Sequence, residues 1–256
     1  MKIVRFKNQD YVGFGKCDQY HITPFLKGKN PYNTSLSDDS FEKSIKFELT
    51  ECAFLPPVKP SKIIGVALNY PGVSENIDKE NPLIFLKSSN TITTSNSVVL
   101  PKNLKAWGEG ELGVIIKKQA KEIDAKDAED FILGFTVVND VTCNNFQGRD
   151  HHLARSKSQD GFCPISNYIE TDYDYTGKVI EAYQNDELIR KGNTSDMVFD
   201  IPSIIEYVTS FMTLFPEDII ITGAPPRVRE KIYLQTNDTY RISIEGLEEI
   251  QTKFLK

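Results

Sequence analysis

The stretch "WGEGELGVII", Trp107–Ile116, places two carboxylates, Glu109 and Glu111, at the start of an apolar run. In a β-strand successive side chains point to opposite faces, so residues two apart share one side. If this run is a strand, Glu109 and Glu111 therefore face the same way. Two like charges held that close repel each other unless a positive group lies between them. The stretch predicts a buried strand and raises the question of what balances its acids.

Composition narrows the class of protein. The chain has 256 residues, is 39% hydrophobic and carries a formal net charge of −6, which suits a globular protein and disfavours a nucleic-acid partner. No run approaches the roughly 20 apolar residues that span a bilayer, and the start "MKIVRFKNQD" has no continuous apolar stretch. The four cysteines lie far apart without metal-ligand spacing, as expected for reduced thiols. We expect a cytoplasmic protein that binds neither nucleic acid nor membrane.

The chain divides at a proline-rich segment. Residues 1–55 read as short alternating segments broken by Gly and Pro, which predicts a small β-rich N-terminal domain. The following "PPVKPSK" predicts a linker, because proline cannot sit in a central strand. Residues 56–256 form the predicted main domain, in which Ile63–Leu68 and Leu83–Lys87 read as buried strands. Between them, "NYPGVSENIDKENP" has the composition of a loop or lid.

Farther along, helical and strand patterns alternate. Asp124 is predicted to cap a short helix that Gly134 ends, and "FTVVND" resumes as a strand that delivers Asp140 at its end. In "DIPSIIEYVTSFMTL", Asp200 precedes an apolar stripe at helical spacing, which predicts a second helix. "DIIITG" reads as a buried strand, and "YRISIEGLEEIQTKF" as a closing hairpin with its turn at Glu245-Gly246.

Glu109, Glu111 and Asp140 are therefore candidate metal ligands. They are hard oxygen donors at strand ends, with neither a histidine nor a cysteine beside them, and Mg²⁺ binds through such carboxylates. The alternative is that the glutamates lie on a solvated strand face while Asp140 caps a turn. For an isolated E-x-E pair this surface interpretation is the better one, because such pairs are common on surfaces.

Read together, the segments resemble the fumarylacetoacetate hydrolase family. The matching segments, in order, are "IIGVALNY", "NPLIFLK", "EGELGVII", "GFTVVNDVT", "RSKSQDGFCPI", "NDELIRKGNTSDMVF", "FMTLFPEDIIITGAP" and "ISIEGL". The resemblance covers roughly residues 60 to 250. It implies an α+β, mostly β fold, a mixed β-sandwich roll with a few helices, paired into a homodimer. It also implies that Glu109, Glu111 and Asp140 hold Mg²⁺, or alternatively Mn²⁺ or Ca²⁺.

The resemblance also implies a substrate class and further site residues. Members of the family bind 2-oxo acids or 1,3-dicarbonyl compounds, whose enolate the metal stabilises. Lys157, in "RSKS", matches the lysine that lies beside metal and substrate. Gln147, and Thr222 with Gly223 in "TGAP", match positions that contact substrate oxygens. Taken alone, Lys157 would be read as a surface cation, Gln147 as a loop amide and Thr222 as a strand-end hydroxyl.

Three positions depart from the family pattern. Val73 stands where hydrolytic and decarboxylating members have a histidine, and Asn76 where a glutamate often follows it. Asn144 replaces an arginine that binds a distal carboxylate. Glu75 is the nearest carboxylate that could act as a base, provided that its loop faces the metal.

The histidines are weak candidates to replace the missing one. His151 and His152 are adjacent, so in a strand at most one could enter the site, and a solvated loop pair is the better interpretation. His21 has no motif near it and is interpreted as structural.

Two classes of function follow. The favoured one is a metal-dependent enzyme that enolises a 2-oxo acid or dicarbonyl compound by tautomerisation, isomerisation or decarboxylation, with Lys157 and Glu75 as catalytic residues. C–C bond hydrolysis is the alternative within the same class, but it needs a base to activate water. The other class is a vestigial protein that binds a metal and a small acid without turnover.

Overall fold

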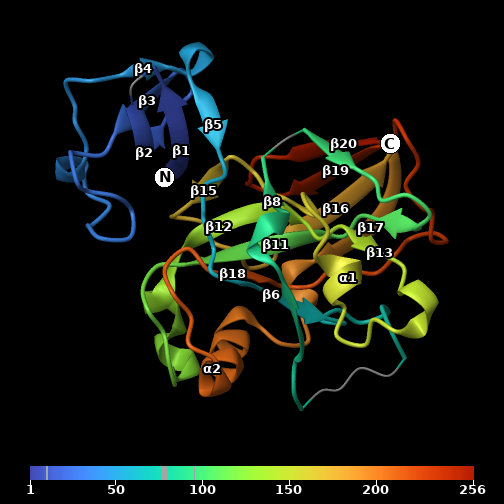
Figure 1. Ribbon diagram of the computed structural model, residues 1–256. Helices are drawn as coiled ribbons and strands as arrows, with labels where there is room; N and C mark the ends of the chain where they lie inside the picture. The colour runs from blue at the N-terminus through green and yellow to red at the C-terminus, as the bar shows by residue number, and fades with distance from the viewer. Residues whose placement is uncertain (10, 76–79, 95) are drawn as a thin grey trace.

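The computed structural model describes residues 1–9, 11–75, 80–94 and 96–256. Asn76, where the sequence departs from the family pattern, lies outside these residues. Within them, a large mixed sheet and a smaller sheet pack against each other, with few helices (Figure 1). The prediction of a mostly β fold is confirmed.

The large sheet runs through the whole molecule and contains eleven strands among the described residues. Its order is β4 (Phe47–Glu48), β3 (His21–Pro24), β2 (Tyr11–Cys17), β1 (Lys2–Asn8), β15 (Tyr168–Glu170), β12 (Ile132–Asn139), β11 (Gly110–Ile116), β18 (Ile219–Ile221), β6 (Ile63–Ala67) and β7 (Leu83–Lys87), with β5 (Ala53–Leu55) also paired to β1. The strands β18 and β6 are parallel, and the other pairs are antiparallel.

The smaller sheet covers the central part of the large one. In the described chain it comprises β17 (Glu187–Asn193), β16 (Val179–Gln184), β19 (Thr239–Ile244), β20 (Ile250–Leu255) and β9 (Ser97–Val99), in that order. Short ladders join β10 (Ala106–Trp107) to β13 (Thr142–Cys143) and β14 (Cys163–Pro164) to β8 (Ile92–Thr93). The helices are α1 (Ala154–Lys157) and α2 (Ile201–Phe211), with 3-10 turns η1 (Asp38–Ser40), η2 (Leu49–Glu51), η3 (Ser89–Thr91), η4 (Ala125–Phe131), η5 (Phe146–Gly148) and η6 (Thr194–Asp196).

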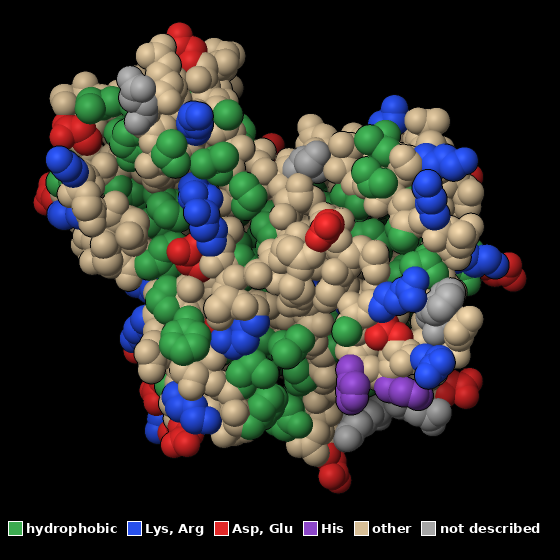
Figure 2. All heavy atoms as spheres, in the orientation of Figure 1, with side chains coloured by type: hydrophobic (Ala, Val, Ile, Leu, Met, Phe, Trp, Pro, Cys, Tyr) green, Lys and Arg blue, Asp and Glu red, His purple; other side chains and the backbone are tan. Residues whose placement is uncertain are grey.

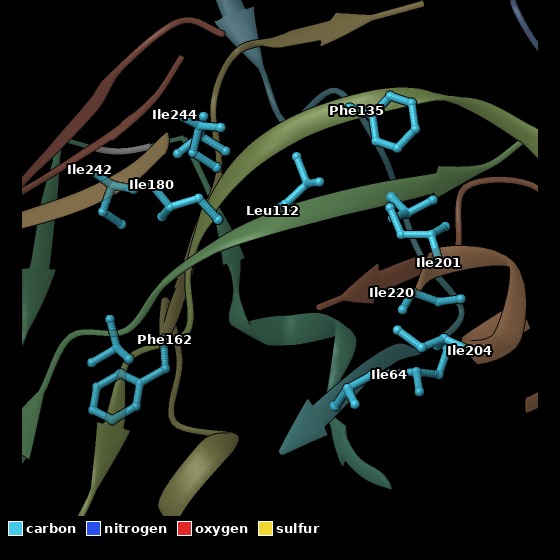
Figure 3. Packing of buried hydrophobic residues seen from close by; sticks show 14 of the residues in the cluster. Ile64, Leu112, Phe135, Phe162, Ile180, Ile201, Ile204, Ile220, Ile242 and Ile244 are labelled. Carbon is cyan, nitrogen blue, oxygen red and sulfur yellow. The ribbon is translucent and has the colours of Figure 1, made fainter. Parts of the chain in front are cut away.

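The main core lies between the two sheets and under α2. Figure 3 shows Ile180, Ile242 and Ile244 of the smaller sheet on one side of Leu112, and Ile201 and Ile204 of α2 close to Ile64 and Ile220 of the large sheet. All of these side chains are buried. All seven residues of β11 are buried, so its side chains do not alternate between the core and solvent. The acids Glu109 and Glu111 thus lie at the start of a fully buried central strand.

The N-terminal residues form their own lobe at the end of the large sheet (Figure 1). The strands β1 to β5 confirm that this segment is β-rich, and Val4, Phe6, Cys17 and Ile22 form a small separate core. The lobe is joined to the rest by pairing of β1 with β15, in which Ile3 lies opposite Ile169. The division into domains 1–55 and 56–256 remains a prediction.

The short helix predicted after Asp124 is wrong in type and extent. The segment Ala125–Phe131 is a 3-10 helix, the Asp124 side chain makes no capping hydrogen bond, and β12 already begins at Ile132. Gly134, the predicted helix end, lies inside β12, where a Cβ would collide with the backbone of Glu170. The glycine therefore permits close strand approach rather than a helix end.

The second helix and the hairpin are confirmed. The Asp200 carboxylate accepts a 2.9 Å hydrogen bond from the backbone N–H of Ser203, which caps α2. The strands β19 and β20 pair antiparallel around the turn that contains Gly246. Neither α-helix in the described part of the chain has the length and apolar content of a membrane-spanning segment.

Candidate active site

Pairing of β11 with β12 brings the three predicted metal ligands together. The strands are antiparallel, with Gly110 opposite Asn139, so the start of one lies beside the end of the other. The backbone N–H of Asp140 donates a 2.8 Å hydrogen bond to the carbonyl of Glu109. Oxygen atoms of Glu109, Glu111 and Asp140 lie within 4.8 Å of one another. The convergence expected from the sequence is therefore present.

Three cationic side chains surround this triad. Lys157 Nζ, at the end of α1, donates a 3.0 Å hydrogen bond to Glu109 Oε2 and also bonds to Asp140 Oδ2. Lys87 Nζ, at the end of β7, donates to Asp140 Oδ1 at 2.6 Å. Arg190 Nη2, in β17, donates to Glu109 Oε1 at 2.7 Å. Within the described chain, three cations thus balance three carboxylates.

Glu111 is held differently from the other two acids. Its Oε2 accepts a 2.7 Å hydrogen bond from the backbone N–H of Gly223, and it makes no ion pair among the described residues. Gly223 has a φ of +94°, and a Cβ there would lie 2.9 Å from the Val66 carbonyl oxygen. Only glycine fits this position without strain, so Gly223, two residues after β18, can bring its backbone N–H to Glu111.

The two glutamates consequently differ in acidity. Burial raises the pKa of Glu109, but the charges of Lys157 and Arg190 outweigh it and lower that pKa to about 2. Burial, then the neighbouring charge of Asp140, raises the pKa of Glu111 well above its ordinary value. Burial would lower the pKa of Lys157, yet the surrounding carboxylates raise it, so this ammonium stays charged.

The site fits a hard divalent cation. It offers carboxylate oxygens alone, and two of the acids, Glu111 and Asp140, are buried side by side at a cost that a cation would relieve. Four buried donor groups nearby lack partners among the described residues: Tyr70 Oη, Trp107 Nε1, Asn139 Nδ2 and Arg190 Nε. Unpartnered buried donors are costly unless a ligand or water satisfies them. The arrangement therefore suits a bound cation with oxygen-bearing ligands.

The remaining predicted residues take different positions. The Thr222 hydroxyl is buried and donates a 3.2 Å hydrogen bond to the Leu112 carbonyl, while Gly223 contacts Glu111 as described. Gln147 lies exposed in η5 with a positive φ of 55°, and Glu75 is exposed in the loop after Tyr70. No described contact joins Gln147 or Glu75 to the triad. Their roles as substrate ligand and base remain predictions.

The histidines lie away from the triad. His151 and His152 are exposed in the loop before α1 and line an apolar groove with Leu83, Leu86 and Phe211. Figure 2 shows two histidine side chains beside hydrophobic side chains on this face. His21 Nε2 lies 3.0 Å from Glu48 Oε1 in the N-terminal lobe, in keeping with a structural role.

Sequence reasoning missed two cations of the site. Lys87 and Arg190 are almost fully buried. The sequence does contain signals for both: a lysine ends the buried strand "LIFLK", and an arginine lies inside "ELIRKGN". Charged side chains are rarely buried without a partner, so each of these cations indicates a buried acid nearby. The pairing itself could not be predicted, since 53 residues separate Lys87 from Asp140.

The fold and the acidic, cation-lined site define a β-sandwich protein with a candidate divalent-metal site between its strands. Residues 62–255 match the model of the fumarylacetoacetate (FAA) hydrolase C-terminal domain. The chain belongs to the fumarylacetoacetate hydrolase family of enzymes, as the sequence motifs implied.

Three similar proteins illustrate the activities in this family. The mitochondrial oxaloacetate tautomerase Fahd2a of Rattus norvegicus is 35% identical over 80% of this chain and 70% of its own length. The structure of 2-hydroxyhepta-2,4-diene-1,7-dioate isomerase from Mycobacterium marinum has a TM-score of 0.88 and 29% identity, covering 100% of this chain and 98% of that one. Maleylpyruvate hydrolase from Sphingobium sp. SYK-6, solved with manganese(II) and pyruvate, has a TM-score of 0.79 and 25% identity, covering 100% and 99%.

Proposed function

We propose that this chain is a Mg²⁺-dependent enzyme that enolises a 2-oxo acid or 1,3-dicarbonyl substrate, leading to tautomerisation, isomerisation or decarboxylation. Mn²⁺ or Ca²⁺ are the alternative ions. Glu109, Glu111 and Asp140 hold the cation. When bound, it supplies the Lewis acidity that makes the proton beside the oxo group easier to remove.

One observation carries this proposal: Lys157 Nζ bonds to both Glu109 and Asp140. Its ammonium is fixed against two ligands of the cation, beside the place where enolate charge would develop. It also lies 4.5 Å from the centroid of the Phe85 ring, which limits its movement. A fixed positive charge in a buried site stabilises developing negative charge without having to reorganise.

Proton transfer is the step for which the described residues offer the fewest groups. Enolisation takes a proton from the carbon next to the oxo group, and tautomerisation returns one to the oxygen or to another carbon. Glu75 is the proposed base, in a loop whose Gly72 lies near Pro226 beside the site. Gln147, Thr222 and Gly223 are the proposed contacts to substrate oxygens. While the Thr222 hydroxyl donates to Leu112, it can only accept a bond from substrate.

Hydrolysis is the second candidate. It is supported by the similarity to maleylpyruvate hydrolase, and it requires a base that deprotonates an attacking water. None of the three histidines contacts the triad in the described part of the chain, and Val73 packs against the hydrophobic core. This favours enolisation, which asks less of a base.

The test uses Mg²⁺-loaded protein with enol-oxaloacetate and with acetylpyruvate. We expect fast loss of the enol absorbance and no acetate release. Glu75→Gln should slow enol conversion, whereas Glu129→Gln, which changes an exposed acid in η4, should not. Fast acetate release that Glu75→Gln leaves unchanged would contradict the proposal and assign hydrolysis to another base.

A binding protein without turnover is the remaining alternative. It is distinguished in the same experiment, because such a protein binds Mg²⁺ but leaves the rate of enol conversion at the level of the metal alone. We also propose, from family membership, that the chain acts as a homodimer in the cytoplasm.

A further inference from the structure

Two more cations lie at the site beyond the three that balance the triad. Arg227 and Lys231 belong to the segment after Gly223, and both side chains are partly buried. Neither makes an ion pair within the described chain. The backbone of Arg227 forms an isolated antiparallel bridge with that of Arg190, the cation bonded to Glu109. Partly buried cations without a counter-ion are unfavourable unless an anion binds them.

Lys231 is held in place by aromatic rings. Its Nζ lies 2.9 Å from the centroid of the Trp107 ring and 5.1 Å from that of Tyr233. Trp107 ends β10, two residues before Glu109, so this ammonium is held against the segment that leads into the metal ligands. Burial, and then the charge of Arg227, lower the pKa of Lys231 to about 8. An ammonium in this position gains from any anion that enters.

Both cations act electrostatically on Glu109, the most exposed of the three acids. Glu109 keeps 19% of its side chain exposed, whereas Asp140 is fully buried. Arg190, which bonds to Glu109, leaves its Nε without a partner among the described residues. A substrate bound at the triad would therefore extend past Glu109 towards Arg227 and Lys231.

The charges of the site indicate what kind of substrate it suits. The triad is balanced by Lys87, Lys157 and Arg190, so a divalent cation leaves two positive charges, which the enolate of a 2-oxo monocarboxylate would neutralise. Arg227 and Lys231 remain in excess. A second carboxylate on the substrate would pair with them.

We propose that Arg227 and Lys231 form a subsite for the second carboxylate of a dicarboxylic 2-oxo acid, and so select dicarboxylates over monocarboxylates. The inference rests on the proposed function and specifies its substrate. It also assigns the distal-carboxylate contact to a segment far along the sequence from Asn144, where the chain lacks the arginine expected from the family.

The test is calorimetric binding of two ligands of equal chain length, 2-oxoglutarate and 2-oxopentanoate, to Mg²⁺-loaded protein. We expect wild type to prefer 2-oxoglutarate by at least about tenfold, because charge-assisted hydrogen bonds to the second carboxylate add affinity. Lys231→Met and Arg227→Gln should each remove most of this preference and leave 2-oxopentanoate affinity within about twofold. Lys231→Arg should retain the preference.

Arg229→Gln is the matched control. Arg229 lies between the two cations in sequence, but its side chain is exposed and its Nη1 bonds to Glu187 Oε2 at 2.6 Å. This variant should keep the wild-type preference. If wild type binds both ligands equally well, or if the variants lower the affinity for both ligands equally, the subsite is rejected while the proposed function stands. If neither ligand binds to wild type, the proposed function fails and the subsite fails with it.

Discussion

Lys87 Nζ donates a 2.6 Å hydrogen bond to Asp140 Oδ1, although neither side chain is exposed to solvent. The same ammonium donates to the Val141 carbonyl at 3.2 Å. This pair joins the edge strand β7 to the end of β12. The site's charges therefore also hold together strands that are distant in sequence.

Removing Lys87 should destabilise the metal-free protein. Lys87→Met leaves Asp140 with Lys157 as its one described counter-ion, and breaking a buried pair typically costs about 3 to 5 kcal/mol. We expect the free energy of unfolding, measured in urea without metal, to fall by about 3 kcal/mol. Lys191→Met removes an exposed pair with Glu181 and should cost less than about 1 kcal/mol. Equal changes in the two variants would refute a stabilising role for the buried pair.

Lys157 should affect turnover more than metal binding. Removing one fixed charge next to a developing oxyanion costs about 2.7 to 4 kcal/mol of barrier, so Lys157→Met should lower kcat about 100- to 1000-fold. Mg²⁺ affinity should persist, because all three carboxylates remain. Steady-state kinetics on enol-oxaloacetate and Mg²⁺ titration of the same preparation measure both quantities. Turnover equal to wild type would return Lys157 to a structural role.

The sequence predicted the three carboxylates of the site but missed two of the cations that balance them, Lys87 and Arg190. The E-x-E spacing and the strand end at Asp140 are local patterns, and β11 and β12 are neighbours in both sequence and sheet. Lys87 and Arg190 reach the triad through long-range packing of β7 and β17, which no local pattern encodes.

The errors in the fold have a similar origin. The segment before β12 has a helical composition, but pairing with β11 extends β12 back to Ile132 and leaves room only for a 3-10 turn. Tertiary pairing thus overrides local propensity. The α2 cap and the final hairpin depend on nearby residues, and both were predicted correctly.

Binding of a dicarboxylate should weaken with rising pH. Burial and the charge of Arg227, reinforced by Arg190 and Lys157 and opposed by Glu109, place the pKa of Lys231 at about 8. The ammonium is present below this pH and lost above it, so affinity for 2-oxoglutarate should fall by about tenfold between pH 7 and 9.5. A bound carboxylate raises the pKa, which moves the midpoint above 8 in the complex.

Two controls accompany the pH series. Affinity for 2-oxopentanoate should change little over the same range, because that ligand has no second carboxylate. Lys231→Arg should make 2-oxoglutarate binding insensitive to pH, since a guanidinium keeps its charge. A parallel fall for both ligands would show that another group titrates.

The proposed dimer is tested by mass in solution. The chain has a mass of 29.0 kDa, so light scattering at micromolar concentration should give about twice this value. A mass near that of a single chain, unchanged on dilution and concentration, would reject the dimer while leaving the metal site untouched.

The proposed chemistry requires that Glu109, Glu111 and Asp140 hold one divalent cation. The decisive measurement is calorimetric titration of Mg²⁺ into metal-free wild type, Glu111→Gln and the exposed control Glu230→Gln. We predict one site per chain in wild type and in Glu230→Gln. In Glu111→Gln, affinity should be at least about tenfold weaker, because a buried carboxylate ligand has lost its charge. Equal affinity in Glu111→Gln and wild type would contradict the assignment.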